Sequence, residues 1–333
     1  MSVTPAAAQS PEGQSVAAPA ALRSELAIHD WLVIGYVIVL NVAVIRGEGG
    51  GNLGRQLAQV LGLLACAFVG IAVGRSNLFR DSWLKAGIYR VAIYGPVQLS
   101  YFFFRELLPH INPRSLDLEL RELDIQLFGV EPALVLEQVL TPFTTEWFSF
   151  FYFGYFFVLA VHVVPILFVV KNQRILGEFA LGMLMLFCIG HTVYMLVPGF
   201  GPYKAMATEF TKPFPHGLWL DMVMDAVRSG GAQKDIFPSL HTAAPAFITL
   251  FSYRFRHLPP YRYTWPIVAF FSLNIMIATL FLRWHYLIDV VAGLLLATVT
   301  AGSVPFLVDW ELRRRRAKGL TLLWPQFGSR DTR

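Results

Sequence analysis

The chain has 333 residues, of which 55% are hydrophobic and only 15% are charged, and its mean hydropathy is +0.53. This composition excludes a soluble globular domain and predicts an all-α, polytopic integral membrane protein. The formal net charge is +5, but in a membrane protein the positions of Lys and Arg matter more than their sum, so no nucleic-acid partner is expected. Two cysteines, Cys66 and Cys188, both lie in apolar runs, which argues against a disulfide framework or a thiolate metal site.

Residues 1–25 are rich in Ala, Pro, Ser and Gln, and no basic segment leads directly from them into an apolar stretch with a cleavage site. We therefore expect a disordered tail and not a signal peptide. Apolar runs that approach the roughly 20 residues needed to span a bilayer then predict about eight transmembrane helices. These runs cover residues 28–45, 56–74, 86–104, 147–170, 176–198, 239–256, 264–282 and 285–308.

The connections between these runs alternate in charge. Lys and Arg gather in every second connection and after the last run, at Arg75, Arg80, Lys85, Lys171, Arg174, Arg254, Arg256, Arg262, Arg313 to Arg316 and Lys318. Because cytoplasmic loops are enriched in Lys and Arg, this pattern predicts that both termini are cytoplasmic, in a plasma (inner) membrane. The connections 46–55, 105–146, 199–238 and 282–285 would then face the opposite compartment.

The chain divides into three parts after the tail. Residues 26–146 hold the first membrane helices and a segment, 105–146, in which Leu, Ile and Phe mix with acidic and basic residues. This mixture predicts amphipathic helices in the membrane interface, as a lid or a guide for lipid entry. Residues 147–310 form the membrane core, and residues 311–333 a basic cytoplasmic tail.

His285 and Asp289 stand four residues apart at the head of the last apolar run. On a helix this spacing places both side chains on one face, so that the carboxylate can orient the imidazole and raise its basicity. Ionisable groups in membrane segments are costly and usually have a functional partner. Asp289 by itself is compatible with a helix-packing hydrogen bond, but the pair predicts a catalytic site.

A second histidine, His241, heads the sixth run in the sequence Phe237-Pro238-Ser239-Leu240-His241. Pro238 favours the first position of a helix, which would place Ser239 and His241 in a first turn that attracts an anion such as phosphate. By itself, a histidine there is compatible with a simple helix-capping role.

Positive charge on the same side comes from Arg283 and Lys204, and Lys204 follows Tyr203 in a turn rich in Gly and Pro. Lys204 is equally compatible with a lipid head-group or interface anchor. Two histidines with separate tasks fit phosphoryl transfer through a phosphohistidine, in which one attacks phosphorus and the other protonates the departing oxygen. The scheme needs no metal and no other cofactor.

At these residues the chain resembles the type 2 phosphatidic acid phosphatase superfamily, and more closely its inositol-phosphotransferase branch, which includes inositol phosphorylceramide synthases. The resemblance covers roughly residues 190–300 and rests on Phe237 to His241 and on Arg283 to Asp289. It implies that His285 is the nucleophile, Asp289 its orienting partner and His241 the acid and base.

The chain departs from the phosphatase branch in two places. It lacks a Lys followed after six residues by Arg-Pro, and it has Ala278 and Thr279 where that branch has Ser-Arg before the nucleophile. The resemblance therefore implies the three catalytic residues, while Arg283, Lys204, Ser239 and Tyr203 are expected to bind phosphate or substrate on position alone.

We therefore expect an enzyme that transfers or hydrolyses a phosphoryl-linked group on a phospholipid or prenyl phosphate at the extracytoplasmic membrane face. If water attacks the phosphohistidine, the protein is a phosphatase, and if an alcohol attacks, it is a phosphotransferase. A non-catalytic lipid-binding or lipid-transport protein on the same scaffold is the alternative. The sequence leaves the lipid, the acceptor and the oligomeric state open.

Overall fold

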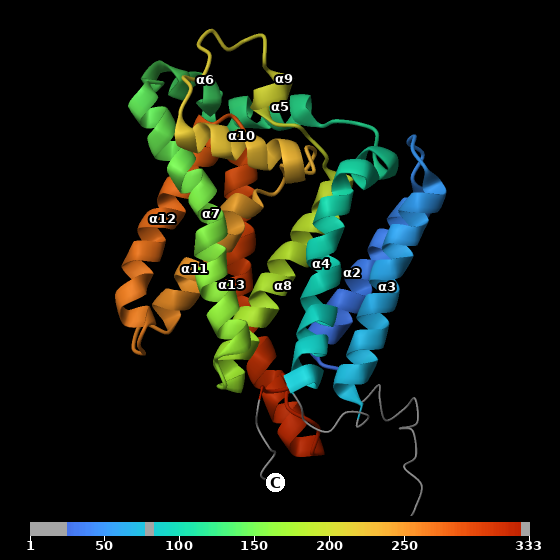
Figure 1. Cartoon of the computed structure of the whole chain (residues 1–333). Coiled ribbons are helices and arrows are strands. Elements are labelled where there is room, and N and C mark those ends of the chain that lie inside the picture. The colour runs from blue at the N-terminus through green and yellow to red at the C-terminus, as the bar shows by residue number, and fades with distance from the viewer. Residues whose placement is uncertain (1–24, 77–82, 328–333) are drawn as a thin grey trace, which may run out of the picture.

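The computed structural model describes residues 25–76 and 83–327, so most of the predicted N-terminal tail, Arg80 and the last six residues lie outside the described residues. Within the described part the chain is helical and contains no strand. Eight long helices run alongside one another as a bundle (Figure 1). They are α2 (Ile28–Arg46), α3 (Leu53–Arg75), α4 (Trp83–Ile111), α7 (Pro142–Phe168), α8 (Gln173–Leu196), α11 (Leu240–Arg254), α12 (Tyr261–Phe281) and α13 (Leu287–Lys318).

Each predicted apolar run coincides with one of these helices, but the number of membrane spans is not confirmed. In the described residues, six of the helices are long and apolar enough to cross a membrane, and α4 and α11 are not among them. Helix α4 carries several charged residues, including Lys85 and Arg90. Helix α11 has 15 residues, which gives it a length of about 22 Å against a hydrocarbon core of about 30 Å. The protein is thus an all-helical membrane protein with six candidate spans.

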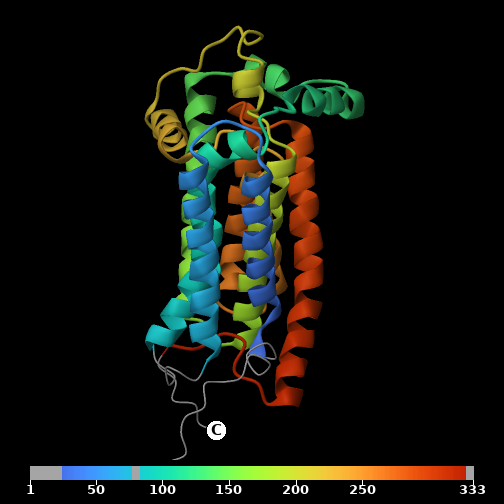
Figure 2. The same cartoon turned by 90° about the vertical axis from the view of Figure 1, so that its right-hand side faces the viewer.

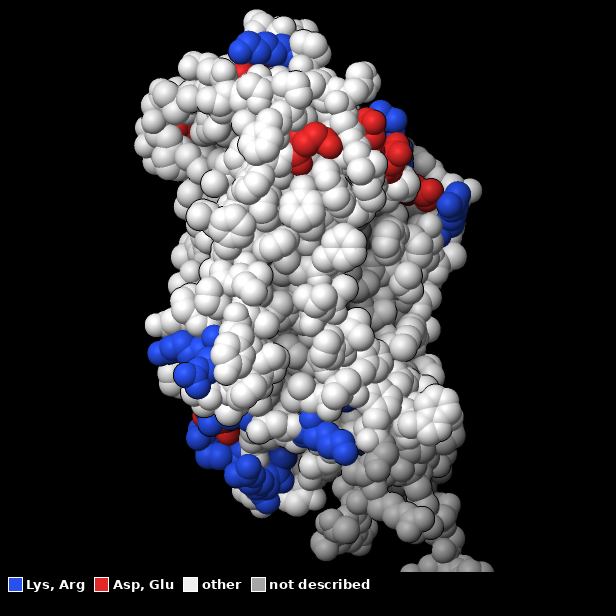
Figure 3. Space-filling model, turned by 60° about the vertical axis from the view of Figure 1, so that its left-hand side comes forward, with Lys and Arg blue, Asp and Glu red and all other residues white. Residues whose placement is uncertain are grey.

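Charged side chains separate toward the two ends of the bundle. On the face shown in Figure 3, Lys and Arg gather at the lower end, acidic residues appear at the upper end, and a wide band between them carries no charge. A belt of this kind matches the apolar interior of a bilayer. The lower end holds the α7–α8 and α11–α12 connections and the end of α13, and the upper end holds the short helices (Figure 1).

Five short elements cover the upper end of the bundle. They are α5 (Asp117–Phe128), α6 (Pro132–Leu136), the 3-10 helix η1 (Glu137–Val139), α9 (Pro202–Ala205) and α10 (Leu218–Gly230). The first three come from the segment for which amphipathic helices are predicted, and α5 lies across the upper end and projects beyond the bundle (Figure 2). Helix α10 was not predicted from the sequence, although it separates apolar from polar residues along its length.

The lower end is closed by a buried ion pair. Arg75 Nε donates to Asp30 Oδ2 at 2.8 Å, and both side chains are fully buried. The remaining guanidinium nitrogens donate to the carbonyl oxygens of Leu322 and Leu323. These contacts hold the segment after α13, whose Trp324 is fully buried and stacks on His29 with a ring separation of 4.3 Å. Arg75 therefore acts as an internal clamp and not as a free loop charge.

Helices α11 and α13 approach one another until their backbones meet. The position that a Cβ atom would occupy on Gly293 of α13 lies 2.5 Å from the carbonyl oxygen of Ser239, at the start of α11. In addition, the Ser239 N–H donates to the carbonyl of Asp289 at 3.0 Å. A side chain at residue 293 would therefore push apart the two helices that carry the predicted catalytic residues.

Replacing this glycine tests the close approach. We expect Gly293→Ala to lower the free energy of unfolding by about 1–3 kcal/mol, because the backbone carbonyl that it would meet cannot rotate away as a side chain can. Gly302→Ala on the same helix meets nothing within 4 Å, and should be neutral or stabilising by up to about 1 kcal/mol. Unfolding by dodecyl sulfate in mixed micelles measures both, and equal stabilities would contradict the proposed contact.

Candidate active site

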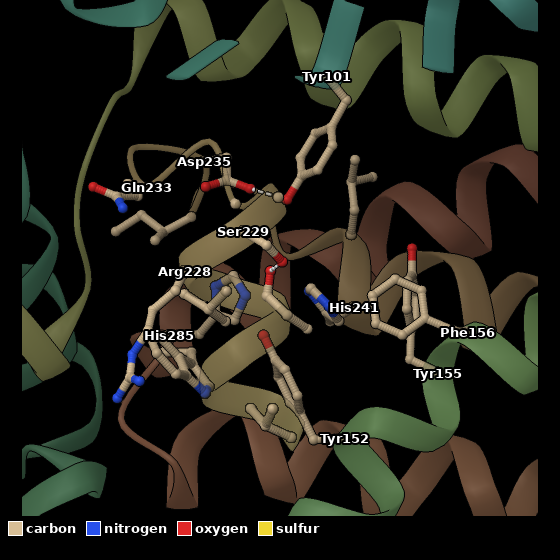
Figure 4. Close-up of a pocket in the computed structure, with 18 of the residues that line it drawn as sticks. Tyr101, Tyr152, Tyr155, Phe156, Arg228, Ser229, Gln233, Asp235, His241 and His285 are labelled. Atoms are coloured by element: carbon tan, nitrogen blue, oxygen red, sulfur yellow. Dashed lines mark hydrogen bonds between the residues drawn. The ribbon is translucent and has the colours of Figure 1, made fainter. Parts of the chain in front are cut away.

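A cavity of about 680 Å³ opens between α4, α7 and α8, beneath α10. Two of its lining residues are His241 and His285, the two histidines that the sequence singled out. Figure 4 shows them on the same side of the cavity as Tyr152, with Asp235 and Tyr101 above. Chain segments that are more than 40 residues apart in the sequence thus converge on one chamber.

His285 lies in the connection between α12 and α13, just before the first turn of α13. Its Nδ1 atom is 3.3 Å from Oδ2 of Asp289, and both side chains are buried. The same carboxylate oxygen accepts the N–H of Tyr286 at 2.9 Å, which stabilises the start of the helix. The predicted pair is therefore formed, and with Nδ1 donating to the carboxylate, Nε2 of His285 keeps its lone pair.

His241 lies in the first turn of α11. Ser239 caps this helix by accepting the N–H of Thr242, so Pro238 lies outside the helix and not at its first position. The imidazole of His241 packs against Tyr152 and Tyr155, with ring separations of 4.7 and 4.4 Å. The rings of His241 and His285 are 6.1 Å apart. A small group could therefore lie between the two imidazoles.

The four residues that were expected to bind phosphate are placed differently from one another. Lys204 and Tyr203 line the rim of the cavity, where Tyr203 packs on Trp284. Ser239 is fully buried and serves as a helix cap. Arg283 does not line the cavity, because its guanidinium donates to the carbonyl of Lys212 at 2.9 Å.

Arg283 is held away from the histidines by several contacts. Its guanidinium is 3.6 Å from Oε1 of Glu137 and lies over the rings of Phe210 and Phe214. Burial lowers the pKa of Arg283, and the Glu137 carboxylate opposes this shift. The backbone of Arg283 has a φ of +67°, a value that residues with a side chain seldom adopt. The spacing to His285 could not reveal this turn.

Acidic residues of α5 fill the backbone sites at which the sequence predicted an anion. Asp124 accepts the N–H groups of Leu287 and Ile288, at 2.7 and 2.8 Å, in the first turn of α13. Asp117 similarly accepts the N–H groups of Phe200 and Gly201 in the glycine-rich turn. These donors are thus already occupied by the protein's own carboxylates, so phosphate has to be bound by other groups.

Asp235 is a further cavity residue that was not predicted. It accepts the hydroxyl of Tyr101 at 2.9 Å, and no salt bridge to it is formed among the residues that the structure describes. Burial raises the pKa of this carboxyl group. The only local signal was an acidic residue six positions before His241, in a loop where acidic residues are common. Gln233 and Arg228 line the same part of the cavity (Figure 4).

Burial also decides the charge of His285. It lowers the pKa of this imidazole to about 4, although the nearby Asp235 carboxylate raises it. His285 is therefore neutral at pH 7, as a nucleophile must be. Among the described residues, no group of three or more His, Cys, Asp or Glu side chains is placed to hold a metal ion.

A family model described as the PAP2 superfamily matches residues 119–303, which is more than half of the chain. The chain belongs to the PAP2 superfamily. The match includes His241, His285 and Asp289 and leaves α2, α3 and α4 outside. Searches of curated proteins and of solved structures found no match.

Membership in the PAP2 superfamily confirms the broader part of the resemblance and supports a phosphatase-type enzyme acting on phosphate esters. The match does not decide the branch within the superfamily. It also agrees with the apolar helices in indicating an integral membrane protein.

The low pKa of His285 can be measured without an activity assay. We expect diethyl pyrocarbonate, which reacts with neutral imidazole, to modify His285 at nearly the same rate at pH 5.5 as at pH 7.5. An ordinary histidine such as N-acetylhistidine should react about tenfold more slowly at the lower pH, because its pKa is about 6.5. Peptide mass spectrometry of the His241→Asn protein isolates the signal, and a tenfold loss at His285 would contradict the neutral state.

Proposed function

We propose that this PAP2 protein is a metal-independent phosphatase or phosphotransferase that acts on lipid phosphate esters or diphosphates through a phosphohistidine at His285. The observation that carries the proposal is the joint presence of His285 and His241 in one cavity, with Asp289 at 3.3 Å from Nδ1 of His285. An oriented neutral imidazole opposite a second imidazole is the arrangement that nucleophilic phosphoryl transfer requires.

In the first step, Nε2 of His285 attacks phosphorus and the bond from phosphorus to the leaving oxygen breaks. The leaving oxygen takes a proton from His241, which must enter this step protonated. Asp289 stabilises the positive charge that develops on His285, because its carboxylate accepts the Nδ1 proton. The 6.1 Å separation of the two rings leaves room for a phosphoryl group between them.

In the second step, neutral His241 accepts a proton from the acceptor while the acceptor oxygen attacks phosphorus. The bond between phosphorus and Nε2 breaks, and its electron pair returns to His285. Water as acceptor releases inorganic phosphate, and an alcohol as acceptor yields a new phosphate ester. The resemblance of Phe237 to His241 to the inositol-phosphotransferase branch favours an alcohol.

Charge neutralisation of the phosphoryl group is assigned to Lys204, which lies at the rim of the cavity with its Nζ atom 3.6 Å from the centre of the Phe200 ring. An ammonium group held only by a ring is free to turn toward a phosphate. Arg228 lines the same cavity and is exposed. Arg283 would have to leave Glu137 and Lys212 to join them.

The site is proposed to face the extracytoplasmic side of a plasma (inner) membrane, with both termini in the cytoplasm. The concentration of Lys and Arg at the opposite end of the bundle supports this orientation. A lipid could then reach the cavity from the outer leaflet through the apolar walls formed by Phe102 and Phe156.

The direct test is turnover by the purified protein without divalent metal. The substrates are phosphatidic acid, a prenyl diphosphate, and phosphatidylinositol together with ceramide. We expect product formation that vanadate inhibits, that His285→Ala abolishes, and that His241→Gln reduces by about 10²–10⁴-fold, the usual contribution of a general acid and base. Free phosphate would identify a phosphatase, and a new phospholipid would identify a transferase.

His162→Gln is the matched control, because His162 bonds only to the carbonyl of Val158 within α7 and does not line the cavity. It should keep the activity of the unchanged protein. Turnover that survives His285→Ala, or that requires a metal, contradicts the mechanism. Lipid binding without turnover or vanadate interaction would favour the lipid-binding alternative.

The orientation has its own test in whole cells. In a Cys66→Ala background, His216→Cys places a thiol on an exposed residue between α9 and α10, and Lys171→Cys places one between α7 and α8. We expect an impermeant maleimide to label residue 216 in intact cells and residue 171 only after lysis. The reverse pattern would overturn the proposed extracytoplasmic site.

A further inference from the structure

The cavity is lined by three helices whose residues fall into layers. Helices α4 and α8 run toward the end of the bundle that carries α10, whereas α7 runs away from it (Figure 1). The layer beside the catalytic residues consists of tyrosines, namely Tyr101, Tyr152 and Tyr194. Tyr101 donates to Asp235, and Tyr152 packs on His241.

A second polar layer lies one helical turn deeper. On each helix, the residue three positions further into the bundle also lines the cavity, and these residues are Gln98, Tyr155 and His191. Three residues of an α-helix span about 4.5 Å. Below this level the wall becomes apolar, with Leu159 on α7 and Phe187 on α8.

The hydrogen bonds around His191 determine which of its nitrogens carries the proton. Ser100 Oγ donates to the carbonyl of Val97 at 2.7 Å, so it accepts the hydroxyl proton of Tyr36 at 2.5 Å. The Tyr36 oxygen, its only proton used, can then only accept from Nδ1–H of His191 at 3.3 Å. Nε2 of neutral His191 is left as an acceptor without a donor among the described residues.

The other two members of the layer are also unpartnered. Neither the amide of Gln98 nor the hydroxyl of Tyr155 makes a hydrogen bond within the described part of the chain, although both line the cavity. Polar groups at membrane depth are costly unless they are paired. Three such groups, on three different helices at one level, are not explained by contacts within the protein.

A ligand can supply the missing partners if it is polar at the right distance from its phosphate. In an acylated lipid phosphate, an ester or amide group follows the phosphate ester oxygen after a few bonds, which corresponds to about one helical turn. In a prenyl phosphate, only hydrocarbon follows. The carbonyl oxygen of an acyl linkage accepts from Gln98 or Tyr155, and the N–H of an amide also satisfies His191.

We propose that Gln98, Tyr155 and His191 form a recognition site for the ester or amide linkage of an acylated lipid phosphate. This assignment rests on the proposed function, because it places the phosphate beside His285. It selects acylated lipids over prenyl phosphates, and amides over esters, from the broader class of substrates considered above. The apolar wall at Leu159 and Phe187 then holds the hydrocarbon chain.

Equilibrium binding to the inactive full-length His285→Ala protein in detergent tests the site apart from catalysis. The probes are ceramide 1-phosphate, phosphatidic acid and farnesyl monophosphate. We expect affinity to fall in that order. In Gln98→Leu and, separately, Tyr155→Phe, the preference for the acylated probes over the prenyl probe should fall about tenfold, which is the effect of losing one buried hydrogen bond.

Phe187→Leu is the control, because it alters the apolar wall below the polar layer and should change the affinity of all three probes by a similar factor. Equal affinity for acylated and prenyl probes, or a preference unchanged in both polar-layer variants, would overturn the proposed recognition site. Two variants guard against a folding defect in one. Failure of the catalytic proposal would show instead as absent turnover in the protein that retains His285, whatever the binding order.

Discussion

The backbone contact between the first turns of α11 and α13 determines the geometry of the candidate site. Ser239 donates its N–H to the carbonyl of Asp289, and Gly293 allows the helices to approach until the carbonyl of Ser239 fills the place of a side chain. His241 follows Ser239 by two residues, and His285 precedes Asp289 by four. The distance between the two imidazoles is therefore set by main-chain atoms, which move less than side chains do.

Carboxylates hold the covering segments onto this core. Asp124 and Asp117 bind backbone N–H groups of α13 and of the glycine-rich turn, and Glu146 accepts the N–H groups of Trp219 and Leu220 at the start of α10. At the other end of α10, Arg105 donates to the carbonyl of residue 228. Each contact pairs a charge with the helix end of opposite polarity. Helix α10 is thereby held from α7 to α4 above the cavity.

The charge distribution within the cavity follows from the same arrangement. Glu137 retains Arg283 at a distance from the histidines, and α5 occupies the helix start that could have attracted a phosphate. Lys204 remains at the rim as a mobile positive charge. Further from the rim, the wall changes from tyrosines to a mixed polar layer and then to phenylalanine and leucine. An amphiphile with its phosphate near the histidines matches this gradient.

The sequence by itself determined the helical membrane class, the positions of all eight bundle helices and the His285–Asp289 pair, because hydrophobic runs and a spacing of four residues are local properties of a helix. It also indicated that His241 would share a site with this pair. Only the tertiary structure decided that Arg283 turns toward Glu137, that Asp235 enters the cavity, and that two of the eight helices fall short of the criteria for a span. These features depend on which distant segments pack together, and the energy of such contacts leaves no periodic signal along the chain.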